Sequence, residues 1–145
     1  MKAKEYLQQL KRMDTAITLK IKEADTLRTR SESMGGRDYS KERVQSSPST
    51  DAPYVKTLAR VIDLEQEIDQ EIDRLSAKRH EIIAQIQGLK NSKHIELLYK
   101  RYVEFKRFDL IAKEMRYTYS YIRALHRHSL QEFERAYKIA QNSTK

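Results

Sequence analysis

The sequence predicts an all-α fold, in which a long antiparallel helical hairpin or coiled coil precedes a C-terminal three-helix unit that contains a helix-turn-helix. The chain of 145 residues has only three glycines and two prolines, and 34% of its residues are charged. Apolar residues also recur at three- and four-residue steps over long stretches. These features are typical of long helices with modest cores. We therefore expect a hairpin domain over residues 1–90 and a helix-turn-helix domain over residues 91–145.

The first expected helix covers about residues 3–33 and carries one apolar stripe. The stripe consists of Tyr6, Leu10, Met13, Ile17, Ala24 and Leu27. Residues 34–53 then contain two glycines, both prolines and several serines, a composition typical of a loop. This loop is expected at the tip of the hairpin.

The second expected helix covers residues 54–89, where the apolar period is 3.5 residues, as in a coiled coil. The predicted seam consists of Leu58, Val61, Glu65, Ile68, Ile72, Leu75, Arg79, Ile82, Ile86 and Leu89. The charged members Glu65 and Arg79 have two interpretations: they set the register or pair across a dimer, or their stems extend to the rim. We expect a homodimer that forms through this hairpin.

Three further helices are expected at residues 93–105, 108–115 and 119–140. The second and third have the spacing of a helix-turn-helix. Ala112 provides the small residue where the helices cross, and Ile111, Met115, Ile122 and Leu125 provide the facing apolar side chains. The spacing alone fits both a DNA-reading helix-turn-helix and a packed helical hairpin, and the positive charge of this segment favours the DNA-reading interpretation.

The predicted recognition helix begins at Thr118, which suits an N-cap and is expected among the DNA-binding residues of this helix. Its outward residues are expected to be Tyr119, Ser120, Arg123 and Arg127, and arginine suits guanine edges or phosphates. Phosphate contacts are expected from Lys106, Arg107, Lys113 and Arg116. Arg116 stands in the turn, where glycine is usual. A left-handed backbone would cost it about 1 kcal/mol, or the turn takes another shape.

The charge distribution indicates a polyanionic partner. The net charge is +8, and residues 90–145 carry +7 of it, from 13 Lys and Arg against 6 Asp and Glu. Nucleic acid is the first expectation, as double-stranded DNA in view of the helix-turn-helix spacing, and an anionic membrane surface is the second. No apolar run is long enough for a membrane helix, and the chain has no cysteine. We expect a cytoplasmic protein with no membrane partner.

Catalysis is not expected, because the sequence offers no nucleophile–base pair, phosphate-binding loop or metal cluster. The acidic stretch from Asp63 to Asp73 spreads its carboxylates around a helix, and His126 and His128 do not share a helix face. The prediction is therefore no enzyme, no cofactor and no metal site.

The segments "RYVEFKRFDLIAKEM" and "YSYIRALHRHSLQEFE" resemble region four of bacterial sigma factors. With "KEYLQQLKRMD", "ERVQSSPSTD" and "IDLEQEIDQEIDRL", the whole chain is similar to a family of small phage and prophage regulators of Gram-positive bacteria, known as a domain of unknown function or as ArpU-like. The resemblance implies a sequence-specific DNA-binding regulator in a bacterial host cell. The alternatives are a protein that docks on RNA polymerase without reading bases, or a DNA-packaging component like a small terminase subunit.

Overall fold

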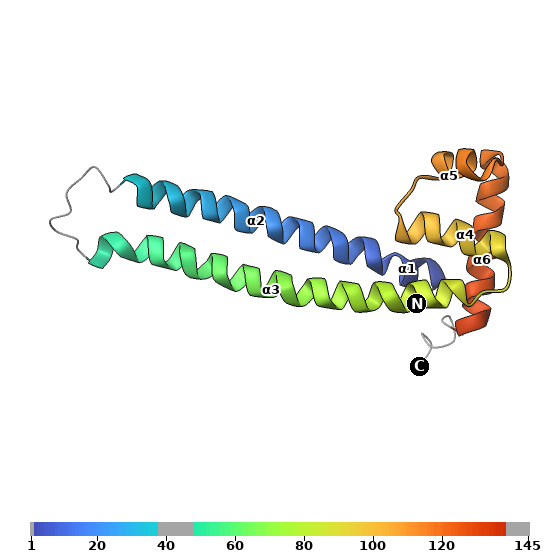
Figure 1. Ribbon diagram of the computed structural model, residues 1–145, viewed down its shortest axis with the longest axis horizontal. Coiled ribbons are helices and arrows are strands. Elements are labelled where there is room, and N and C mark those ends of the chain that lie inside the picture. The colour runs from blue at the N-terminus through green and yellow to red at the C-terminus, as the bar shows by residue number, and fades with distance from the viewer. Residues whose placement is uncertain (1, 38–47, 139–145) are drawn as a thin grey trace. The chain divides into compact units, whose positions relative to one another are not determined.

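The computed structural model describes residues 2–37 and 48–138, and its helices are drawn in Figure 1. No strand occurs in these two ranges, which confirms the all-α prediction. The elements are α1 (Ala3–Leu7), α2 (Gln9–Arg37), α3 (Pro48–Gln87), α4 (Ser92–Leu98), the π-helix η1 (Tyr99–Val103), α5 (Phe108–Met115) and α6 (Tyr119–Tyr137).

The expected loop at residues 34–53 is shorter than predicted at both ends, because α2 extends to Arg37 and α3 begins at Pro48. A proline is compatible with the first turn of a helix, where its missing N–H has no intrahelical partner. The central part of this segment, residues 38–47, lies outside the described residues, as do residues 139 and 140 at the end of the last expected helix.

The chain divides into two compact units. One unit combines Met1–Met13 with Leu75–Lys145, and the other is Asp14–Arg74. The sequence-based division into residues 1–90 and 91–145 stays a prediction about domains.

In the unit Asp14–Arg74, parts of α2 and α3 run antiparallel (Figure 1). Their buried apolar residues are Ile17, Ala24, Val61, Leu64 and Ile68. Ion pairs join the helices at the surface, where Arg28 lies 2.8 Å from Glu65 and Arg60 lies 3.4 Å from Glu23. Exposed pairs of this kind add little stability, so the apolar contacts carry most of it.

The predicted seam of α3 is only partly confirmed in this unit, because Val61 and Ile68 are buried but other members are not. Leu64, which the prediction left out, is 1% exposed, whereas Leu58 is 37% and Ile72 is 45% exposed. The buried residues Val61, Leu64 and Ile68 belong to one stripe, and Leu58, Glu65 and Ile72 lie on a neighbouring stripe at the surface. A 3.5-residue period fits both stripes. The predicted seam therefore took residues from each stripe in turn.

The other unit has a continuous core formed by residues from its N-terminal and C-terminal segments. Phe133 of α6 is fully buried in it. The buried members are Ala3, Leu7, Leu10, Ile82, Ile86, Leu89, Leu98, Tyr102, Val103 and Phe133. Polar contacts accompany this packing, since the backbone N–H of Ala3 donates to Oε1 of Glu134 at 3.2 Å. The hydroxyl of Tyr137 donates to the carbonyl of Gln85 at 2.6 Å.

Gly88 ends α3 where Tyr137 approaches closely. A Cβ at Gly88 would lie 2.7 Å from the Tyr137 hydroxyl. Asn91 then caps α4, because its side chain accepts from the backbone N–H of Lys93 at 2.9 Å. This stop and restart agree with the end expected for the second helix.

The expected helix at residues 93–105 is interrupted. The chain changes from α4 to η1 at Tyr99, and Phe105 then adopts a left-handed backbone with φ of 60°. The N–H of Glu104 donates to the carbonyl of Tyr99 at 3.1 Å, the wider spacing of a π-helix. Non-glycine residues rarely adopt such a φ, and strain of this kind concentrates at functional sites.

Candidate nucleic-acid interface

The pair α5 and α6 packs through the apolar positions that the sequence indicated. Ile111 and Ile122 are fully buried, and Ala112 and Leu125 are nearly so. Leu97 of α4 completes this cluster, with Phe108, Met115 and Tyr117 packed against it. The small side chain of Ala112 lets the two helices approach where they meet.

The turn between α5 and α6 has the left-handed geometry considered for Arg116. Its φ and ψ are 62° and 44°. The N–H of Tyr117 donates to the carbonyl of Ala112 at 2.9 Å, and that of Arg116 donates to the carbonyl of Lys113 at 3.2 Å. This pair of bonds is a Schellman motif, which usually has glycine at the position of Arg116. The strain predicted for Arg116 is therefore present.

Thr118 caps α6 as expected. It has an extended backbone, and its hydroxyl oxygen accepts from the backbone N–H of Tyr121 at 3.1 Å. The cap fixes the start of α6 at Tyr119, two residues after the Schellman turn ends.

The predicted recognition residues are all exposed: Tyr119, Ser120, Arg123 and Arg127. Tyr119 and Arg123 contact each other, because the Arg123 guanidinium donates a hydrogen bond to the hydroxyl of Tyr119 at 3.1 Å. The Arg123 guanidinium carbon also lies 5.4 Å from the ring centroid of Phe108. The structure brings these two side chains together and holds Arg123 in a defined position on the surface.

The four expected phosphate contacts differ in their surroundings. Lys106 lies 2.9 Å from Glu114 and 3.3 Å from Glu104. Arg107 is 85% exposed and lies 3.5 Å from Asp109. Lys113 and Arg116 are exposed, and neither forms an ion pair with a carboxylate of the described residues.

Glu114 forms ion pairs with two lysines of this surface. Its carboxylate lies 2.8 Å from Lys100 and also binds Lys106. The hydrogen bond from Lys100, followed by that from Lys106, lowers the pKa of the Glu114 carboxyl. The bond to Glu114 likewise raises the pKa of Lys106. The Lys106 charge is therefore partly neutralised within the protein, and Lys113 and Arg116 are the cations most available to a phosphate.

Beneath this surface lies a buried polar pair that sequence reasoning missed. The hydroxyl oxygen of Tyr102 lies 2.6 Å from Nε2 of His126. Burial, with the nearby positive charge of Arg101, lowers the pKa of His126 to about 4. Burial also raises the pKa of Tyr102 to about 12. The signal available in the sequence is the concentration of aromatic residues between Tyr99 and Tyr121.

Phe108 connects this pair to two arginines. Its ring meets the ring of His126 edge-on at 4.9 Å, and the Arg101 guanidinium lies 4.1 Å from its centroid. Arg123 approaches the same ring, so aromatic and cationic groups support the exposed face from below.

No cluster of three or more potential metal-ligating side chains occurs among the described residues. Within the same part of the chain, no helix is long and apolar enough to cross a membrane. Comparison with protein-family models, with curated proteins and with solved structures found no match to the chain.

Proposed function

We propose that this protein is a sequence-specific, double-stranded DNA-binding regulator of transcription, with α5 and α6 acting as a helix-turn-helix similar to region four of bacterial sigma factors. The resemblance to small phage and prophage regulators is part of this proposal. It includes no catalytic activity and no cofactor.

The observation that carries the proposal is the exposed N-terminal half of α6. It presents Tyr119, Ser120, Arg123 and Arg127 while its opposite side packs on α5. In a helix-turn-helix, the N-terminal residues of the second helix contact base edges in the major groove. Arg123 and Arg127 lie four residues apart, so they project from the same side of the helix.

The unpaired cations support the same surface. Lys113 and Arg116 precede the exposed face of α6, and phosphate contacts from such residues position a protein on DNA. We assign base contacts to Arg123 and Arg127 and phosphate contacts to Lys113, Arg116 and Arg107. Lys106 contributes less, because Glu104 and Glu114 already bind it.

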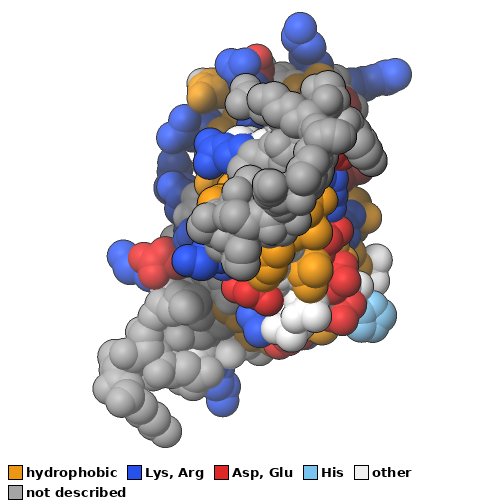
Figure 2. All heavy atoms as spheres, turned by 90° about the vertical axis from the view of Figure 1, so that its left-hand side faces the viewer, with side chains coloured by type: hydrophobic (Ala, Val, Ile, Leu, Met, Phe, Trp, Pro, Cys, Tyr) orange, Lys and Arg blue, Asp and Glu red, His pale blue; other side chains and the backbone are white. Residues whose placement is uncertain are grey.

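The surface of α3 supports the proposed homodimer. Val55 is 57%, Ile62 is 51% and Ile72 is 45% exposed. With Leu58 they follow the heptad spacing on one stripe of α3, which suits pairing with another helix. Figure 2 shows hydrophobic side chains at the surface beside charged ones.

Selection of bound sequences from random double-stranded DNA tests the proposal, with the full chain at several salt concentrations. We expect one enriched motif, and an affinity that falls steeply as salt rises. Absence of enrichment, together with recovery of RNA polymerase from host extract, would replace base reading with polymerase docking.

A further inference from the structure

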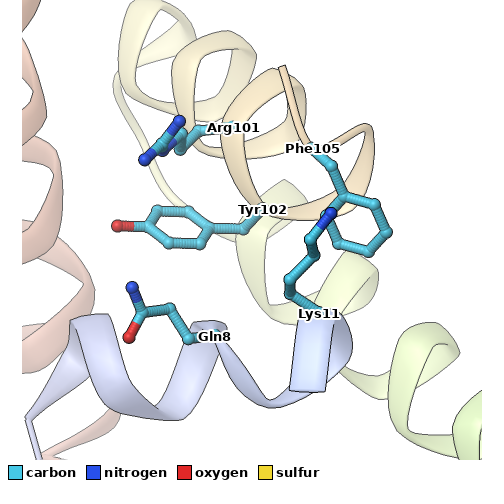
Figure 3. Close-up of a pocket in the computed structure, with 5 residues that line it drawn as sticks. All are labelled: Gln8, Lys11, Arg101, Tyr102 and Phe105. Atoms are coloured by element: carbon cyan, nitrogen blue, oxygen red, sulfur yellow. The ribbon is translucent and has the colours of Figure 1, made fainter. Parts of the chain in front are cut away.

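A small cavity in the unit Met1–Met13 with Leu75–Lys145 has an unusual lining. It has a volume of about 120 Å³ and is lined by Gln8, Lys11, Arg101, Tyr102 and Phe105. Figure 3 shows Gln8 and Lys11 on one side, with Arg101 and Tyr102 across from them and Phe105 beside Lys11. The lining therefore has two cations and an amide, and no carboxylate.

The two cations rest on aromatic rings. Nζ of Lys11 lies 4.8 Å from the ring centroid of Phe105, and the Arg101 guanidinium lies 4.1 Å from that of Phe108. Neither cation forms an ion pair with a carboxylate in the described part of the chain. Cation–π contacts hold both side chains and leave their positive charge uncompensated.

Arg101 keeps donors for a ligand. One of its N–H groups donates to the carbonyl of Lys106 at 3.0 Å. A guanidinium has five N–H donors in a fixed plane, so this bond and the stacking on Phe108 fix its orientation without using all of them. Lys11 adds an ammonium and Gln8 adds an amide N–H₂.

The backbone at the cavity is unusual as well. Arg101 and Tyr102 belong to η1, and Phe105 follows it with a left-handed φ of 60°. A π-helix and a strained non-glycine residue both occur often at functional sites. Here they place Arg101, Tyr102 and Phe105 around one space.

We infer that this cavity is an anion-binding site that accepts a phosphate group. Donors from three side chains surround the space, and guanidinium and ammonium groups form charge-assisted hydrogen bonds with the several acceptor oxygens of a phosphate. The apolar ring of Phe105 closes one side. The positive field also reaches the neighbouring His126, since the charge of Arg101 helps to lower its pKa.

The phosphate group has two sources, a free small molecule or a DNA strand, and the inference does not depend on DNA binding. The first experiment titrates the isotope-labelled full chain with inorganic phosphate and follows backbone amide shifts by NMR, with sodium chloride at matched ionic strength. We expect saturable shifts at Gln8, Lys11 and Arg101, with sulfate acting similarly and acetate more weakly.

Variants make this titration specific. Lys11→Gln and Arg101→Gln should each weaken phosphate binding by about tenfold or more, the usual scale of a charge-assisted hydrogen bond. Arg101→Lys retains the charge but loses the planar fork, so it should fall between these and the native chain. Lys22→Gln, an equal charge change at an exposed position of the other unit, should have no effect. Lys11 is exposed, so Lys11→Gln leaves the core intact. This variant keeps the test valid if Arg101→Gln disturbs the fold.

A second experiment identifies the source. Binding to DNA is measured at several salt concentrations with the same variants. If Lys11→Gln and Arg101→Gln both lose DNA affinity and inorganic phosphate causes no saturable amide shifts, the site binds a phosphate of the DNA strand. Saturable phosphate binding without an effect on DNA assigns it to a small molecule. No saturable phosphate shifts, together with unchanged DNA affinity in both variants, would overturn the inference.

Discussion

The hydroxyl oxygen of Tyr102 lies 2.6 Å from Nε2 of His126, and both side chains are buried between η1 and α6. The contact joins η1 to α6, the helix that carries the proposed DNA-binding surface. Because burial lowers the pKa of His126 from its ordinary 6.5 to about 4, the folded protein holds this imidazole neutral.

This pair makes stability depend on pH. Below about pH 6.5 the unfolded chain protonates His126, while the folded chain does so only near pH 4, so the folded state loses stability as pH falls through this interval. We expect a loss of about 1.5 kcal/mol between pH 6.5 and 5 in the free energy of unfolding, measured with urea. His126→Gln should lack this component, and an unchanged pH dependence in that variant would show that His126 is not its source.

Arg116→Gly should stabilise the protein by about 1 kcal/mol, because glycine adopts the left-handed backbone without strain. The same change should weaken DNA binding by removing a cation at the turn. Thermal unfolding and DNA titration measure the two effects. Lys138→Gly is the matched control, because Lys138 ends α6 with φ of 51°, and it should gain stability without losing DNA affinity. Tighter DNA binding by Arg116→Gly would contradict the assignment of Arg116.

Arg127→Ala should reduce affinity for the selected DNA motif by about tenfold and relax preference at one base position. Arg135→Ala is the comparison, since it removes an exposed arginine from the last turn of the same helix. Arg123 is a less direct test, because its side chain also contacts Tyr119 and Phe108. If Arg127→Ala and Arg135→Ala reduced the affinity for the selected motif equally, the assignment of base contacts to α6 would be wrong.

Glu114→Gln should act in the opposite direction. It removes the carboxylate that Lys100 and Lys106 share and leaves each lysine with one other carboxylate, Glu96 and Glu104 respectively, so both ammonium groups become more available to phosphate. We expect tighter binding to any DNA sequence and a steeper dependence of affinity on salt. Glu96→Gln, whose carboxylate lies 3.9 Å from Lys100, is a milder comparison. Weaker binding by Glu114→Gln would mean that its ion pairs organise the interface instead of masking it.

Self-association through α3 is tested by replacing Leu58 and Ile62 together with glutamate. The two chains of a dimer would then bring four glutamates together, and their repulsion should prevent association. Sedimentation should show a monomer for this variant and a dimer for the native chain. Leu19→Glu is the control, because Leu19 is 58% exposed on α2 and outside the stripe on α3. A monomeric native chain, or dissociation by the control alone, would exclude this interface.

The sequence predicted features with a local cause. The bounds of α5 at Phe108 and Met115, the cap at Thr118 and the strained turn at Arg116 follow from capping preferences and from apolar residues spaced over a few turns. The packing of Ala112 and Ile122 followed from the same local pattern.

Features that depend on distant contacts were not predictable from such patterns. Two adjacent apolar stripes on α3 have the same period, so the period does not show which stripe is buried. Packing against α2 buries the stripe that contains Leu64. The π-helix η1 has no local signature, because its residues fit an α-helix equally well. The contact of Tyr102 with His126 and the cavity beside Arg101 arise only after this backbone shift.

The hydrogen bond between Ala3 and Glu134 joins residues 131 positions apart. Leu7 and Leu10 belong to the same core as Phe133, so this core closes only when segments far apart in the sequence meet. Contacts of this sequence separation slow folding, because a long loop must close before they form. A chain truncated before α6 would lack Phe133 and the hydrogen bond to Ala3, but would keep the other nine buried members of this core.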